Sequence, residues 1–393
     1  MNFRRWSVCL LVCLLGGAGD AAAAGGADPS LPALKSACIA HYAEIMAAEY
    51  DDALALAGQL QTKIETLAAQ PSADHLAAAR AAWIECRRPY SQSEVGRFYD
   101  GPIDAVEGYV NAWPIDENYL DYTAGMPEVG IINEVKQFPE ITRDVLVGAN
   151  EREGEKTVST GFHAIEFLLW GQDLYADSPG RRSYTDYVDS PDGPGRHAGR
   201  RRLYLRLLAS LLVDQLRTVA LEWAPNNPHN YRARLLAQPP DNALAAILTG
   251  VGNLASAELY GERLLVPYTT QLQENEESCF SDTTHLDLLN NELGVQNICL
   301  GRYARMDGTV LEGPGLLDLL NKTDASAAVT LQRRAAACVA ALRAIPPPFD
   351  QAMLGGNRAP GRVAIKKSLD ALQAQTTALL KAGEVLHIHF NLK

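Results

Sequence analysis

Apolar residues recur at helical spacing along most of the chain. From Leu34 to Ala69 they return every three or four positions, Pro71-Ser72 then breaks the pattern, and a second helix is expected from Ala73 to Arg87. Alternating runs of β-branched residues are nearly absent outside 385–390, so the sequence predicts an all-α protein made of helical bundles. The same periodicity predicts later helices at residues 201–223, 243–265, 281–293, 325–344 and 362–382.

The helix expected from about Val158 to Gly171 is apolar on nearly all sides. It carries His163 and Glu166, which lie within roughly 60° of each other on one face of a helix. The opposite face is apolar as well, which indicates that this helix is buried in a bundle. An ionised carboxylate there is costly unless a metal, a cation or several donors satisfy it. The pair is therefore the main candidate site, with a hydrogen-bonded core histidine as the alternative.

Two stretches of the chain lack this helical pattern. Residues 101–150 are punctuated by Gly-Pro and X-Pro pairs, so long connections with brief helices are expected there, lying over one end of a bundle. Residues 178–202 form a loop that contains several arginines. We interpret it as a solvated linker, with anion or partner binding as the alternative. This loop divides the chain into two predicted helical bundles, residues 30–195 and 196–393.

The N-terminus has the pattern of a secretory signal. Arg4-Arg5 precede an apolar run from Trp6 to Leu15 and a small-residue stretch that ends at Ala24. We therefore predict a signal peptide at residues 1–24 and a periplasmic or cell-surface protein, with a twin-arginine export route as the second alternative. The apolar run is too short to span a bilayer, so no transmembrane anchor is expected in the mature form.

Charge and cysteine content narrow the classes of function. The formal net charge is −12, and it becomes −13 without the signal, which removes two arginines and one aspartate; this acidity argues against nucleic-acid binding. Five cysteines remain in an oxidising compartment: Cys38, Cys86, Cys279, Cys299 and Cys338. Their odd number predicts one or two disulfides and a free thiol, and the spacing of Cys279 and Cys299 suits a local bridge. None forms a CxxC or CxxCH pattern, which argues against zinc ribbons and covalent haem.

A histidine and a glutamate are too few ligands for a tightly bound metal, so further ligands must come from elsewhere in the chain. Glu94 is one candidate, and an ion pair with Arg87 or Arg88 explains its position equally well. Iron, zinc and manganese all suit such a set, and the spacing does not choose between them.

Other candidates lie in loops and near the C-terminus. Asp116 and Glu117 are carboxylates beside a tryptophan, and solvated loop carboxylates are the commoner case. His387 and His389 point the same way only if their segment is a strand. With no third ligand nearby, a terminal metal clip is the weaker interpretation.

The second half of the chain repeats features of the first. Laying Thr160–His163 over Asp282–His285 places a histidine at the same point of each half, which predicts internal duplication of one bundle. Asp282 and His285 are therefore candidate ligands from the second bundle. The alternative for Asp282 is that it caps a helix beginning at Thr283.

The motif Gly161-x-His163-x-x-Glu166, extended through Trp170-Gly171, resembles that of the imelysin family, also called peptidase family M75, and within it the iron-regulated protein A type. The resemblance spans most of the mature chain. It implies a two-domain helical fold with the GxHxxE site near the interface of the bundles, in exported proteins linked to iron uptake. It also implies envelope iron-transport components as partners. Supporting stretches are Trp83–Glu94, Trp113–Glu117, Arg200–Leu205 and Ser278–His285.

Three hypotheses follow. In the first, an exported protein binds a metal ion, iron favoured and zinc second, or a metal-bearing ligand at His163 and Glu166 for iron uptake. In the second, the same site serves a metallopeptidase of the M75 type, although the chain has no His-Glu-x-x-His motif. In the third, the pair is only a buried hydrogen bond of a structural module.

Overall fold

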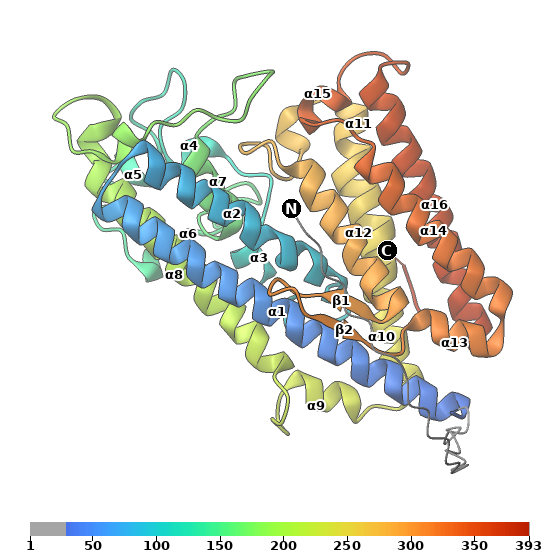
Figure 1. Ribbon diagram of the computed structural model, residues 1–393. Coiled ribbons are helices and arrows are strands. Elements are labelled where there is room, and N and C mark those ends of the chain that lie inside the picture. Colours follow the sequence, from blue (N-terminus) through green and yellow to red (C-terminus); the bar gives the residue numbers. More distant parts are fainter. Residues whose placement is uncertain (1–28, 393) are drawn as a thin grey trace, which may run out of the picture.

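The computed structural model describes residues 29–392, and its regular structure is almost entirely helical (Figure 1). In a first bundle, α1 (Leu31–Ala69) packs lengthwise against α2 (Ala73–Ser93) and α8 (Ala198–Trp223). The shorter α7 (Gly161–Trp170) packs on α2 and α8. The prediction of an all-α protein is confirmed.

A second bundle follows in the chain and lies beside the first in Figure 1. Its long helices α14 and α16 pack on each other, α12 packs on α14, and α12 also packs on α2, which joins the two bundles. Its elements are α10 (Pro240–Asn253), the π-helical η4 (Leu254–Leu265), α11 (Val266–Thr270), α12 (Thr284–Leu300), α13 (Leu316–Thr323), α14 (Ala325–Arg343), α15 (Phe349–Met353) and α16 (Pro360–Leu386).

Short elements connect the long helices. Between α2 and α7 the chain forms brief helices in a long connection, as expected for residues 101–150. They are η1 (Glu94–Gly96), α3 (Glu107–Val110), α4 (Glu117–Leu120), α5 (Gly130–Asn133) and α6 (Arg143–Ala149). The other short helices are η2 (Tyr184–Tyr187), η3 (Gly193–His197), α9 (Tyr231–Leu236) and η5 (Gln273–Asn275).

The first two long helices begin with serine caps. The side chain of Ser30 accepts a hydrogen bond from the amide of Ala33 at the start of α1, and Ser72 does the same at α2. The helix expected to end at Arg87 continues to Ser93. Because of this extra length, the last turns of α2 reach the second bundle.

The chain also contains a β-hairpin that the sequence did not predict. Strands β1 (Arg302–Ala304) and β2 (Val310–Glu312) pair antiparallel, with Tyr303 opposite Leu311. The segment after α16 is not a strand: His387 ends the helix in a left-handed conformation, with φ of 55°. His387 and His389 therefore do not share a strand face, and the condition for a terminal metal clip is not met.

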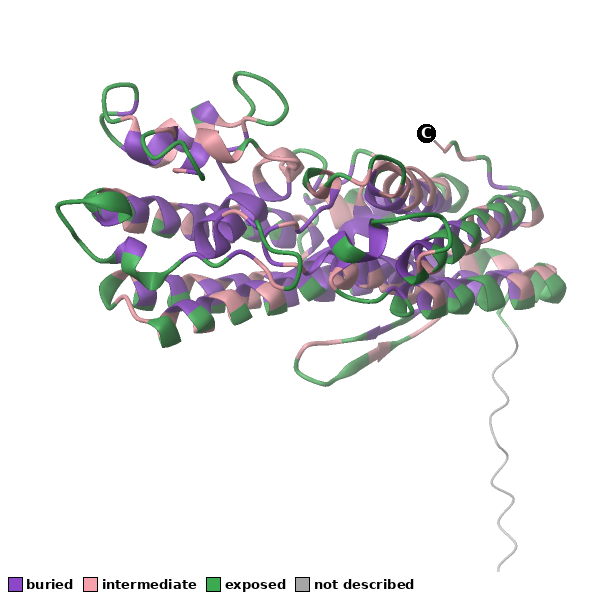
Figure 2. Cartoon of the chain, turned by 90° about the horizontal axis from the view of Figure 1, so that it is seen from above, coloured by how far each residue is buried: buried purple, intermediate pink, exposed green. Residues whose placement is uncertain are grey.

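The packing of helix α8 concerns the boundary predicted between the two bundles at residue 195. It begins just after that point, yet it packs along α1 and against α7 of the first bundle. Figure 2 shows buried residues along the inner sides of both bundles, with exposed residues on the outer sides. In the described part of the chain, Pro240–Thr270 is long and apolar enough to cross a membrane by length and composition, and 61% of its most apolar window is buried inside the structure.

The expectation of disulfides is wrong for the described residues, in which all five cysteines are free. Cys279 precedes α12 and Cys299 lies in its last turn. Ser278, the neighbour of Cys279, bonds Asp287 in the first turn of α12, and a rise of 1.5 Å per residue places Cys299 about 18 Å further along that helix, beyond the reach of a disulfide. The predicted signal peptide and its two cysteines lie outside the described residues.

Arg181 and Arg196 of the loop before α8 are exposed, whereas Arg200 and Arg201 in the first turn of α8 are turned toward the protein. Arg200 donates to the backbone oxygens of Ile131, Ile132 and Phe138. The guanidinium of Arg201 is buried and donates to both carboxylate oxygens of Asp121, at 2.6 and 2.7 Å. These side chains fix the long connection onto the first bundle.

Candidate functional site

The helix α7 is buried along its whole length, as the sequence predicted. It opens at Gly161 with φ of 86°, and a Cβ at this position would lie 2.6 Å from the carbonyl oxygen of Val110. Only glycine allows both this left-handed backbone and this close approach of α3. The helix ends at Gly171, whose φ of 72° is again left-handed. Backbone conformation and close packing therefore explain why the first residue of the motif is glycine.

His163 and Glu166 are in direct contact on α7. The Nδ1 atom of His163 lies 2.8 Å from Oε2 of Glu166. The other oxygen of Glu166, Oε1, accepts hydrogen bonds from the backbone amide of Ser281 at 2.9 Å and from its hydroxyl at 2.7 Å. Both oxygens of this fully buried carboxylate are therefore satisfied by the protein.

This geometry fixes the tautomer of His163. A carboxylate oxygen accepts, so the proton of the neutral ring belongs on Nδ1, and Nε2 carries a lone pair. The side chain is 1% exposed, and within residues 29–392 Nε2 has no hydrogen-bond partner. A histidine oriented by a carboxylate on one nitrogen, with its other nitrogen free, is the usual arrangement of a metal ligand.

A cavity of about 310 Å³ lies next to His163. Its wall includes Trp113 and Pro114 before α4, Asp173 after α7, and the segment Leu272–Phe280 before α12. Phe280 packs on Phe167 of α7, with ring centroids 5.1 Å apart. The cavity thus lies between α7, the long connection of the first bundle, and the segment of the second bundle that precedes α12.

Glu276 is a cavity residue that the sequence analysis missed. It is 1% exposed, and neither of its oxygens accepts a hydrogen bond of ordinary geometry from the described part of the chain. Burial and then the carboxylate of Asp350 raise the pKa of Glu276 well above its usual 4.5, and the Thr284 hydroxyl offsets only part of this. Its sequence context, Glu274-Asn275-Glu276-Glu277, has the composition of a solvated segment.

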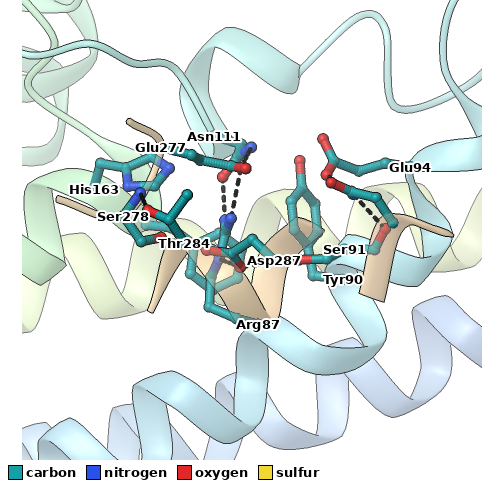
Figure 3. Close-up of polar contacts among 12 residues, drawn as sticks. Arg87, Tyr90, Ser91, Glu94, Asn111, His163, Glu277, Ser278, Thr284 and Asp287 are labelled. Atoms are coloured by element: carbon teal, nitrogen blue, oxygen red, sulfur yellow. Dashed lines mark hydrogen bonds and ion pairs between the residues drawn. The ribbon is translucent and has the colours of Figure 1, made fainter. Parts of the chain in front are cut away.

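Glu277 also lines the cavity, but it belongs to a buried ion cluster (Figure 3). Arg87 donates to Oε1 of Glu277 at 2.7 Å, to Oδ1 of Asp287 at 3.0 Å and to Asn111. Burial opposes the charge of Glu277, but Arg263 and Arg87 outweigh it, so the pKa of this carboxyl lies below its usual value. The cluster connects α2 to the second bundle.

Glu94 is in the same cluster and not in the wall of the cavity. Both of its oxygens accept from Arg263, at 2.8 and 2.9 Å, and Oε1 also accepts from Arg97. The expected partners, Arg87 and Arg88, are not the ones that form. Burial opposes ionisation of Glu94, yet Arg263 holds its pKa well below the usual range. This side chain is therefore occupied as an ion-pair partner.

Arg263 comes from the π-helical segment η4. In a π-helix the hydrogen bonds join residues five apart, so Glu258 and Arg263 lie on the same face, and their side chains pair at 2.9 Å. The helical spacing predicted an ordinary α-helix throughout 243–265, so this π-helical geometry was not expected.

The two loop carboxylates, Asp116 and Glu117, have different positions and partners. Asp116 is exposed and accepts a hydrogen bond from the amide of Asn118 as the N-cap of α4. Glu117 lines the cavity beside His163 and accepts a hydrogen bond from Gln172. Asp116, which the sequence made a candidate ligand, is not in the wall of that cavity.

Asp282 and His285 lie near the cavity without lining it. Asp282 has φ of 58°, and α12 starts at Thr284 with Thr283 as its N-cap residue, so the expected cap at Asp282 is wrong. Burial, followed by Asp173 and Asp350, raises the pKa of Asp282 to about 7. Burial lowers the pKa of the half-buried His285.

The predicted set of ligands is therefore not assembled. In the part of the chain that the structure describes, no group of three or more His, Cys, Asp or Glu side chains converges as a metal site would require. What the cavity offers is two buried groups that receive no hydrogen bond of ordinary geometry from the described residues, the Nε2 atom of His163 and the carboxyl of Glu276. Such groups suit an ion that keeps water molecules as its remaining ligands.

Comparison with known proteins gives a consistent picture. The family model described as imelysin, peptidase M75, matches residues 46–379. The iron-regulated protein A of Synechococcus elongatus is 28% identical over 346 residues, which cover 86% of this chain and 82% of that protein.

Solved structures share the fold. A crystal structure from Parabacteroides distasonis, of a protein described as an iron-regulated protein A precursor, has a TM-score of 0.70 at 20% identity and covers 92% of this chain and 97% of its own. The structure of an imelysin-like protein from Psychrobacter arcticum has a TM-score of 0.64 at 16% identity, with 92% and 98% covered. At these identities the likeness concerns the fold alone.

Proposed function

The chain belongs to the imelysin family, peptidase family M75, and on this basis we propose that it is an exported protein that binds a metal ion or a metal-bearing ligand in the cavity beside His163. Iron is the favoured metal and zinc the second. The name of the relative from Synechococcus elongatus, iron-regulated protein A, supports the choice of iron. The proposed role is iron uptake, with envelope iron-transport components as partners.

One observation carries the proposal. The Nε2 atom of His163 is buried at the edge of a cavity of about 310 Å³, and the residues described provide it with no partner. Leaving such an atom without a hydrogen bond costs about 1–3 kcal/mol, a cost that a bound ligand would remove. In this proposal His163 is the ligand, and Glu166 orients it.

The test is metal content and titration with the mature protein. Wild type and His163→Ala would be compared by elemental analysis and by equilibrium titration with Fe²⁺ and Zn²⁺, with His229→Ala as a control because this histidine is exposed and outside the cavity. Binding is expected in wild type and His229→Ala and lost in His163→Ala. Equal metal content in all three proteins would refute the proposal.

The metallopeptidase alternative receives no support from the geometry. A general base must be free to accept a proton from water, but both oxygens of Glu166 already accept hydrogen bonds from His163 and Ser281. We therefore do not propose proteolysis.

The proposed location rests on the N-terminal pattern at residues 1–24. Fractionation of cells that produce the full-length chain tests it directly. The mature protein is expected outside the cytoplasm and shorter by about 24 residues, as a signal peptide implies. A full-length product in the cytoplasm would contradict the proposal.

A further inference from the structure

The surroundings of the cavity are strongly acidic. Five carboxylates line the cavity beside His163, five others line an adjoining cavity of about 310 Å³, and two more line a third of about 530 Å³. Pro114 is part of the wall of all three, so they open around one segment. Among the described residues that line the three cavities, these twelve carboxylates compare with two lysine or arginine residues, Arg97 and Lys156. We call this region the acidic mouth.

The nearby arginines compensate Glu277 and no other carboxylate in the wall of the cavity beside His163, as far as the described residues show. None of the described residues that line it is a lysine or an arginine. Arg87 and Arg263 lie behind Glu277, and each is bound to two or more carboxylates, with the side chains fully or almost fully buried. An anionic ligand would therefore meet, besides Glu277, carboxylates that form no ion pair with a described lysine or arginine, and it would find no lysine or arginine in the wall, which is costly in a buried site.

Glu276 adds a second, independent observation. Its carboxyl group is buried in the wall of the cavity, and no described side chain or amide bonds either oxygen with ordinary geometry. His163 provides a nitrogen in the same condition. One imidazole nitrogen and one carboxylate are ligands of the kind that borderline divalent ions take together with water.

We infer that the ligand of this cavity is a hydrated divalent cation and not an anionic metal chelate, and that Glu276 holds it together with His163. The inference rests on the proposed function and names the class of ligand for the same site. The volume agrees with it, because the four water molecules that complete a shell of six ligands, at about 30 Å³ each, take up about 120 Å³ of a cavity of about 310 Å³. The acidic mouth concentrates cations at the entrance, so association should slow as salt rises.

The test compares cationic and anionic forms of the same metal. Wild type, His163→Ala, Glu276→Gln and the control Glu140→Gln would be titrated with Fe²⁺ under anaerobic conditions, with Mn²⁺, with ferric citrate and with haem. Glu140 is exposed and lies outside the three cavities. Thermal unfolding checks that each variant folds, and Glu276→Asp, which keeps the charge with a shorter reach, should retain part of the binding.

Wild type and Glu140→Gln are expected to bind Fe²⁺ and Mn²⁺ and not the anionic chelates, and Glu276→Gln should bind at least about tenfold more weakly. Binding of ferric citrate or haem that is lost in His163→Ala would overturn the inference and leave the proposed function intact. Unchanged affinity in Glu276→Gln would overturn the assignment of Glu276. If wild type binds none of the four probes, the inference and the proposed function both fail.

Discussion

The replacement Glu166→Gln tests whether Glu166 acts by orienting His163. The amide and hydroxyl of Ser281 donate to Oε1 of Glu166, so the oxygen of a glutamine would stay on that side. Its NH₂ group would then face Nδ1 of His163, which lies 2.8 Å from Oε2 in the native protein. An NH₂ group can only donate, so Nδ1 would have to accept, and the ring proton would move to Nε2. The lone pair that faces the cavity would be lost.

The expected cost is that of removing an orienting partner of a metal ligand. Such changes lower metal affinity by about 10–100-fold, which corresponds to about 1.4–2.8 kcal/mol. The stability of the fold should change little, because the number of hydrogen bonds is conserved. Titration with Fe²⁺ and Zn²⁺ measures the affinity, and ¹⁵N NMR of the histidine ring measures the tautomer. Glu140→Gln serves as the control for removing one carboxylate charge at an exposed position.

Two results would refute this reasoning. Wild-type affinity in Glu166→Gln would mean that the tautomer does not matter for binding. A loss of affinity with the proton still on Nδ1 would mean that Glu166 acts by its charge, or as a ligand itself, and not by orientation.

Three further predictions concern stability, measured by urea unfolding. Arg87→Met leaves two buried carboxylates without this partner and should cost about 3–5 kcal/mol, whereas Arg88→Met, which removes an exposed pair, should cost less than about 1 kcal/mol. Gly161→Ala should lower the free energy of unfolding by about 2–5 kcal/mol, because alanine would have to adopt a left-handed backbone and its Cβ would clash with a carbonyl oxygen. In the control Gly148→Ala, the added Cβ meets nothing within 4 Å, so this variant should be more stable by up to about 1 kcal/mol. Burial raises the pKa of Glu292 from 4.5 to about 8, so its contribution to the free energy of unfolding is full below about pH 4.5 and is lost as the pH rises through 8. In Glu292→Gln the free energy of unfolding should fall by up to about 5 kcal/mol less over this pH range than in wild type. Equal pH profiles of stability in the two proteins would contradict this prediction.

The positions of the long helices could be predicted because each has a local cause. Apolar spacing predicted the start of α1 to within three residues and both ends of α7 to within a few residues. The contact of His163 with Glu166 was predicted for the same reason, since residues three apart meet on any α-helix. The hairpin was missed because its strands are three residues long and give no periodic signal.

The ion cluster could not be predicted, because its partners are far apart in the chain. Arg87 pairs with Asp287, 200 positions away, and Glu94 pairs with Arg263, 169 positions away. Local spacing offered an ion pair with Arg87 or Arg88 as the alternative to a ligand role for Glu94, but the partners in the structure are Arg263 and Arg97. Only the packing of α2 against α12 and η4 decides which charges meet in the interior.

Long-range contacts also explain why we propose that Glu166 orients His163, whereas the sequence made it a candidate metal ligand. Spacing shows that two side chains share a face, but it does not show which of their atoms remain free after the chain folds. Ser281, which satisfies one oxygen of Glu166, lies 115 positions away. Once both oxygens are satisfied, a second ligand must come from another segment, and the buried carboxyl of Glu276 is the group in the cavity wall that the fold leaves without a partner among the described residues. A composition typical of solvated loops is therefore compatible with a binding residue, because burial is decided by the packing of the two bundles and not by the local sequence.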